Sequence, residues 1–107
     1  MVILMTAAFI PVFNINDIPE GEMRPCDFEG QDIALFNVEG CIYATQNECT
    51  HGRAALTDGY LFGDEIECPL HQGMFNVRTG EAVATPCTEP LRTYVVEVHN
   101  GVIYLEK

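Results

Sequence analysis

Two short stretches of this chain each carry a cysteine and a histidine close together. One residue separates Cys49 from His51, two residues separate Cys68 from His71, and sixteen residues lie between the two pairs. Thiolates and imidazoles bind iron, copper and zinc. Spacings this short suit loops that close around a compact centre rather than one face of a helix. The sequence therefore predicts a metal centre held by these four side chains.

Two kinds of cofactor accept this set of donors. A cluster of two iron and two sulfide ions can take two cysteines on one iron and two histidines on the other. A single zinc ion can take the same four ligands. Zinc modules usually pair cysteine with cysteine and histidine with histidine, whereas each stretch here has one of both. The pattern favours the iron–sulfur cluster, and a structural zinc module stays open as the less favoured alternative.

The residues around the donors extend the pattern. Residues 49–52 read C-T-H-G, and residues 68–75 read C-P-L-H-Q-G-M-F. Together with Asp58-Gly59 and Thr79-Gly80, they resemble the Rieske-type ferredoxins of bacterial aromatic-ring-hydroxylating dioxygenase systems. The resemblance extends from about residue 9 to residue 106 of this chain. It implies one Rieske-type [2Fe-2S] cluster as the cofactor.

The resemblance also implies an all-β Rieske fold built from antiparallel sheets. We expect a single domain over residues 1–107, with a cluster-binding subdomain at about 46–86 inserted into a β base. The chain pattern agrees, because short apolar stretches alternate with turn residues and no repeat or linker divides them. The resemblance further implies that a proline loop containing Pro86 covers one side of the cluster.

Turn residues predict where the strands begin and end. Strands are expected beside them at 24–28, 34–38, 41–44, 60–62, 65–68, 74–77, 93–98 and 102–105. Asn100-Gly101, between the last two ranges, is the strongest hairpin signal in the chain. Residues 14–18 are expected to form one helical turn capped by Asn16.

Histidine ligands set the charge that the cluster carries. Two ferric ions, two sulfides and two thiolates are neutral together, whereas a cluster with four thiolates is doubly negative before any electron arrives. Histidine ligation therefore raises the reduction potential from about −400 mV to roughly −150 to +300 mV. High-potential relatives place hydroxyl donors where this chain has Gly73 and Phe75. We expect a potential at the low end of the range, because both donors are missing.

The charge of the chain indicates which partners it meets. Five Lys and Arg oppose sixteen Asp and Glu, for a formal net charge of −11, which disfavours nucleic acid and anionic membranes. An acidic electron carrier gains encounter rate with basic protein partners. Residues 1–13 are mostly apolar but fall short of the roughly 20 residues of a membrane helix. We expect no membrane contact and a cytoplasmic location.

The histidine content bears on whether the chain is an enzyme. A mononuclear oxygenase iron needs two histidines and a carboxylate, and a cluster would leave only His99 of the three histidines. The sequence contains no glycine-rich phosphate-binding motif of the kind that would indicate a nucleotide or flavin site. We expect an electron carrier rather than an enzyme. The resemblance implies that it accepts electrons from an NAD(P)H-dependent ferredoxin reductase and delivers them to the terminal oxygenase of an aromatic-ring dioxygenase system.

Such a carrier would be a monomer that serves the catabolism of aromatic hydrocarbons. A small Rieske subunit of a larger oxidoreductase, of the nitrite-reductase small-subunit type, stays open as an alternative. The surface would distinguish the two, because a permanent subunit should expose a large apolar patch.

Three cysteines remain outside the metal centre: Cys26, Cys41 and Cys87. We expect them to be small buried or half-buried side chains without a disulfide.

Overall fold

The structure is a computed structural model that describes residues 8–107 except His51 and His71. The predictions that concern residues 1–7 and these two histidines therefore lie outside the described residues. The strands are β1 Phe9–Asn14, β2 Met23–Phe28, β3 Gln31–Val38, β4 Cys41–Gln46, β5 Tyr60–Phe62, β6 Glu65–Glu67, β7 Met74–Asn76, β8 Ala82–Ala84, β9 Thr93–Tyr94, β10 Val96–His99 and β11 Val102–Glu106. Two 3-10 helices, η1 Ile15–Asp17 and η2 Leu56–Asp58, complete the described elements.

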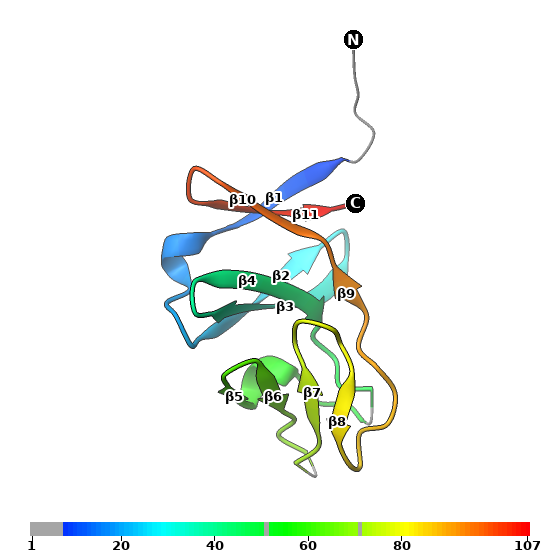
Figure 1. Ribbon diagram of the computed structural model, residues 1–107. Coiled ribbons are helices and arrows are strands. Elements are labelled where there is room, and N and C mark those ends of the chain that lie inside the picture. Colours follow the sequence, from blue (N-terminus) through cyan, green and yellow to red (C-terminus); the bar gives the residue numbers. More distant parts are fainter. Residues whose placement is uncertain (1–7, 51, 71) are drawn as a thin grey trace.

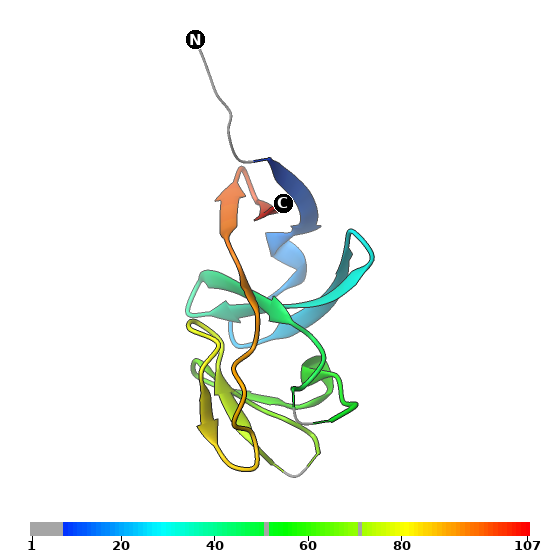
Figure 2. The ribbon, with the colours of Figure 1, turned by 90° about the vertical axis from the view of Figure 1, so that its right-hand side faces the viewer.

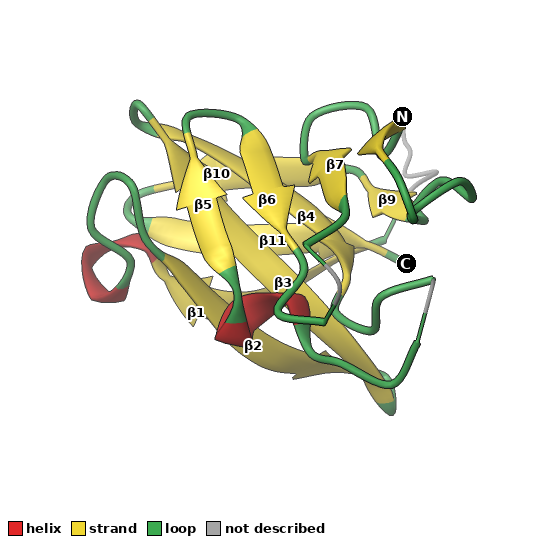
Figure 3. Ribbon diagram, turned by 90° about the horizontal axis from the view of Figure 1, so that it is seen from below, coloured by secondary structure: helices red, strands yellow, loops and turns green. Residues whose placement is uncertain are grey.

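The strands form three antiparallel sheets stacked along the long axis of the molecule (Figure 1). We name them the upper sheet (β1-β11-β10), the middle sheet (β2-β3-β4-β9) and the lower sheet (β5-β6-β7-β8). Seen from below, the lower sheet lies in front of the other two (Figure 3). The predicted all-β class with antiparallel sheets is confirmed. No helix in the described part of the chain is long and apolar enough to cross a membrane.

Strand β3 separates two hydrophobic cores. Its side chains alternate in direction, as in every strand, and they are buried on both faces. Ile33 and Leu35 join the core beneath the upper sheet, whereas Ala34 and Phe36 join the core above the lower sheet. All four are fully inaccessible to solvent. The middle sheet is therefore a wall shared by both cores, and its lower face supports the loops that follow.

Hairpins form where glycine-containing turns predict them, as two examples show. Strands β3 and β4 pair from Val38 and Cys41 outward, and β10 and β11 pair around the predicted Asn100-Gly101 turn. Asn100 and Gly101 have φ values of 53° and 79°. Two successive positive values are the geometry of a type I′ turn, which matches the twist of the strands that it joins.

The segment expected to be one strand at 93–98 is two strands, so that prediction is wrong. The chain leaves the middle sheet at Val95 and enters the upper one, because Tyr94 pairs with Ala44 whereas Val96 pairs with Leu105. Figure 2 shows this part of the chain running from the lower sheet past the middle sheet to the upper one. The stretch from β8 to β10 thus contributes one strand to each of the three sheets.

The helical turn at η1 has a different cap from the one predicted. The Asn14 side chain accepts the backbone N–H of Asn16 at 2.8 Å, so Asn14 is the N-cap and Asn16 is the residue that it caps. Strand β8 and η2 were not anticipated from the sequence. Both are three residues long.

Candidate metal centre

Two loops of the lower half bring the two predicted cysteine ligands together. Cys49 lies on the first ligand loop (residues 48–55, between β4 and η2), and Cys68 lies on the second ligand loop (residues 68–73, between β6 and β7). Cys49 is 3% exposed to solvent and Cys68 is 1% exposed. Both belong to the same cluster of buried residues, so the two loops meet at one core. The other two predicted ligands, His51 and His71, lie outside the described residues.

Asn47 closes the first ligand loop at its base. It is 2% exposed, and it is bonded to both ends of the loop. Its carbonyl oxygen accepts the Leu56 N–H at 2.7 Å, and its side-chain Oδ1 accepts the Thr57 N–H at 3.0 Å. Its Nδ2 donates to both carboxylate oxygens of Asp32 at 3.2 Å, which fixes the loop to the start of β3. The loop that carries Cys49 is therefore anchored to the middle sheet.

Backbone hydrogen bonds set the shape of both loops. The Cys49 N–H donates to the Ala54 carbonyl at 2.9 Å, and the Cys68 N–H donates to the Gly73 carbonyl at 2.7 Å. Each cysteine thus begins a turn that the backbone closes five residues later. The second loop is also held by the pairing of Glu67 with Met74, where β6 meets β7. The short spacings in the sequence are therefore spacings of tight loops, as predicted.

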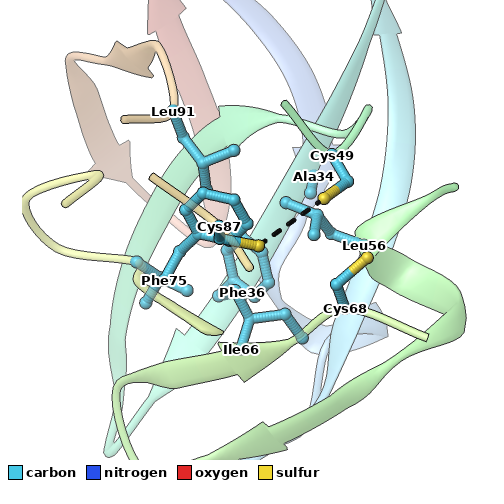
Figure 4. Packing of buried hydrophobic residues seen from close by; sticks show 10 residues of the cluster. Ala34, Phe36, Cys49, Leu56, Ile66, Cys68, Phe75, Cys87 and Leu91 are labelled. Carbon is cyan, nitrogen blue, oxygen red and sulfur yellow. Dashed lines mark hydrogen bonds between the residues drawn. The ribbon is translucent and has the colours of Figure 1, made fainter. Parts of the chain in front are cut away.

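A third segment lies against the two loops. We name residues 85–92, between β8 and β9, the cover segment. The Thr50 hydroxyl on the first ligand loop donates to the Glu89 carbonyl at 2.8 Å. Cys87, which is 3% exposed, places its Sγ 3.9 Å from the Sγ of Cys49. Figure 4 shows the sulfur atoms of Cys49, Cys68 and Cys87 within the core that lies between the middle and lower sheets.

Sequence reasoning assigned Cys87 to the core but missed its contact with a predicted ligand. The signal that could have found it is its place directly after Pro86, in the loop expected to cover the cluster. Pro86 itself is half-buried. Of the other two cysteines, Cys26 is half-buried as expected, but Cys41 is exposed, because it starts β4 immediately after a surface turn. None of the five cysteines, all of which the structure describes, forms a disulfide.

Burial raises the pKa of two thiols at the site, those of Cys68 and Cys87. It raises the pKa of Cys68 to about 11, and the hydrogen bond with Cys49 raises it further. Burial also raises the pKa of Cys87 to about 12, with a second contribution from the electrostatic interaction with the neighbouring Cys49. A thiol must lose its proton to bind a metal. Metal binding by Cys68 would therefore release a proton.

The donor chemistry fits a centre that needs two thiolates and two further ligands. Cys49 and Cys68 are soft donors in an apolar core, as iron–sulfur and zinc sites require. Among the described residues, no three His, Cys, Asp or Glu side chains are arranged to hold a metal ion. The two buried thiols are the described part of the donor set predicted from the sequence.

The sequence of the chain matches a known protein family, and it is similar to a ferredoxin component over almost its full length. Residues 8–95 match the family described as Rieske [2Fe-2S] domain. The ferredoxin component of the naphthalene 1,2-dioxygenase/salicylate 5-hydroxylase systems of Ralstonia sp is 50% identical over 102 residues. That match covers 95% of this chain and 98% of the relative.

Solved structures agree with this similarity over nearly the whole chain. The ferredoxin of Sphingomonas yanoikuyae B1 has a TM-score of 0.89 and 38% identity, covering 94% of this chain and 99% of that one. A chain from the complex of reduced oxygenase and oxidized ferredoxin in carbazole 1,9a-dioxygenase has a TM-score of 0.87 and 41% identity. The match covers 92% of this chain and 92% of that one.

Proposed function

Because this chain belongs to the Rieske [2Fe-2S] domain family, we propose that it is the ferredoxin of an aromatic-ring dioxygenase system. It accepts one electron at a time from an NAD(P)H-dependent reductase and delivers it to the terminal oxygenase. It is an electron-transfer component and not itself an enzyme. The 50% identity to a ferredoxin component over almost the full length of both chains supports this assignment.

The proposed cluster ligands are Cys49, His51, Cys68 and His71. The observation that carries the proposal is the pair of buried thiols, Cys49 and Cys68, held together by two loops that the backbone closes tightly. The cluster, when bound, takes up and returns one electron. Ile66, Phe75 and Leu56 surround the pair with apolar surface that is fully buried, and they keep water away from its sulfur atoms.

The division of labour within the domain follows the sheets. We propose that residues 46–86 act as the cluster-binding subdomain, because they contain both ligand loops and all of the lower sheet. The upper and middle sheets draw their strands from both sides of this insertion and serve as the β base. The Asn47 bonds to Asp32 fix the one part to the other.

Transient partners suit the surface of the described residues better than a permanent one. The large exposed hydrophobic side chains lie on opposite edges of the lower sheet, on the second ligand loop and near β10: Tyr60, Phe62, Leu70, Val83, Val95 and Val98. They do not form the single apolar face that a permanent subunit buries. We propose a cytoplasmic monomer that meets its reductase and its oxygenase in turn, drawn by its negative charge.

The test begins with the cofactor of the purified protein. Two iron and two sulfide per chain, with a visible spectrum that bleaches under dithionite, are expected, whereas a colourless protein containing zinc would overturn the proposal. A reductase and a terminal oxygenase of a naphthalene-type system then serve as partners. We expect reduction by the first and reoxidation by the second, both slower at higher salt because exposed charges are screened. A fully loaded protein that neither partner can reduce or oxidise would contradict the carrier role.

A further inference from the structure

Cys87 is a buried thiol in contact with a proposed cluster ligand. Its Sγ is 3.9 Å from that of Cys49, within the range of a sulfur–sulfur hydrogen bond, in which either sulfur could be the donor in the absence of a metal. Iron binding removes that ambiguity, because a cysteine ligand binds as thiolate and has no proton to donate. The only proton available between the two sulfurs then belongs to Cys87.

We propose that the Cys87 thiol donates a hydrogen bond to the Cys49 sulfur and thereby raises the reduction potential of the cluster. This inference rests on the proposed function, since it requires the cluster. Cys87 acts through Cys49 and is therefore a positioning residue for electron transfer rather than a ligand.

Gly73 provides the space for this thiol. A Cβ added at Gly73 would overlap the Cys87 Sγ, and it would also approach the Cys87 Cβ and backbone nitrogen at 3.1 Å. The second ligand loop therefore needs glycine at this position for the cover segment to pack against it. Gly73 has no side-chain donor, so Cys87 brings one to this side of the site from the cover segment.

Three hydrogen bonds hold the cover segment where Cys87 can reach Cys49. The Thr50 hydroxyl donates to the Glu89 carbonyl at 2.8 Å, two residues beyond Cys87. The Cys87 N–H donates to the Ala84 carbonyl at 3.2 Å, and the Leu91 N–H donates to the Gly80 carbonyl at 2.7 Å. Hydrogen bonds thus fix the backbone at Cys87 and shortly after it, which restricts the positions that the thiol can take.

The direction of the effect follows from charge. Reduction adds negative charge to the cluster and its sulfur ligands, and a hydrogen-bond donor stabilises the more negative state more strongly. Removing the donor should therefore make reduction harder. We expect Cys87→Ala to lower the equilibrium constant for reduction about tenfold, which corresponds to about 59 mV for one electron.

The first experiment compares three fully loaded variants by spectroelectrochemical titration. Cys87→Ala removes the donor, Cys87→Ser replaces the thiol with a hydroxyl, and Cys41→Ser is a matched control on the exposed start of β4. We expect a lower midpoint potential for Cys87→Ala, a smaller change for Cys87→Ser and none for Cys41→Ser. An unchanged Cys87→Ala potential overturns the inference. Equal shifts in both Cys87 variants also overturn it, because they indicate packing alone.

A second experiment leaves Cys87 in place, in case its variants fail to hold the cluster. In the double variant C26S/C41S, Cys87 is the only cysteine outside the proposed ligand pair. Its S–H stretching band in the infrared should move to lower frequency when dithionite reduces the cluster, because the acceptor becomes more negative. A band that is absent or does not move overturns the inference while leaving the carrier role intact. A wild-type protein that binds no cluster would instead overturn the proposed function.

Discussion

The Asn47 side chain accepts the backbone N–H of Thr57 across the full length of the first ligand loop, at 3.0 Å. This one residue therefore joins the two ends of the loop that carries Cys49, and its Nδ2 joins the loop to Asp32. The described hydrogen bonds of its side chain go to Asp32 and Thr57. Its importance lies in shaping the loop before a metal arrives.

Replacing Asn47 with alanine should destabilise the protein and speed the loss of its cluster. The change leaves the half-buried Thr57 N–H without its partner, which costs about 1–3 kcal/mol. The Asp32 carboxylate is exposed and can bond to water instead. Urea unfolding of the protein without cluster would measure the stability, and the decay of visible absorption in a chelator would measure cluster loss. Asn16→Ala, at an exposed position, is the control, and equal behaviour of the two variants would refute the role of Asn47.

A methyl group at Gly73 should push the cover segment away from the second ligand loop. Gly73→Ala is expected to cost about 1–3 kcal/mol of stability, because the new Cβ overlaps the Cys87 sulfur. In a Cys87→Ala background the cost should be smaller, and a double-mutant cycle from urea unfolding measures the difference. Gly52→Ala is the matched control, since its Cβ would meet Leu70 Cδ1 at an ordinary 3.7 Å. Strict additivity of the two changes would contradict the contact.

Substituting His51 with cysteine tests the proposed ligand set. A third thiolate adds negative charge to the cluster, so we expect a lower midpoint potential or a failure to assemble the cluster. Spectroelectrochemistry and iron analysis distinguish these two results. His99→Cys introduces the same side chain at an exposed position on β10 and should change neither quantity. A His51→Cys protein with full cluster and native potential would show that His51 is not a ligand.

The pH dependence of stability should reveal the half-buried thiol of Cys26. Burial, followed by the nearby charges of Asp27 and Asp32, raises its pKa from 9.0 to about 11. The unfolded chain releases this proton first, so the contribution to stability is complete below about pH 9 and disappears as the pH rises through about 11. Urea unfolding across this range should show a steeper loss for the wild type than for Cys26→Ala. Parallel curves would mean that Cys26 titrates alike in both states.

Local patterns predicted much of this fold. The Asn100-Gly101 dipeptide predicted its hairpin because two residues with positive φ nearly determine the turn. The close spacing of each cysteine with its histidine predicted tight loops, and backbone hydrogen bonds close both of them. In these cases the information lies within a few residues, so one sequence is sufficient to read it.

Relations between distant segments could not be read in the same way. Nothing near Val95 indicates that the chain changes sheets there, because the change depends on two different pairing partners far away in the sequence. The contact between Cys49 and Cys87 spans 38 residues and arises only after three segments pack together. The need for glycine at residue 73 follows from that packing and not from the turn in which it lies.

Strand β3 has a consequence for how the molecule comes apart. Its alternate side chains belong to both cores, so neither core can open to water without exposing half of the same strand. Partial unfolding of the β base would thus also disturb the face of the middle sheet that supports the two ligand loops. We expect the two halves to unfold together in a single cooperative step, so that loss of colour and loss of β-structure occur at the same temperature.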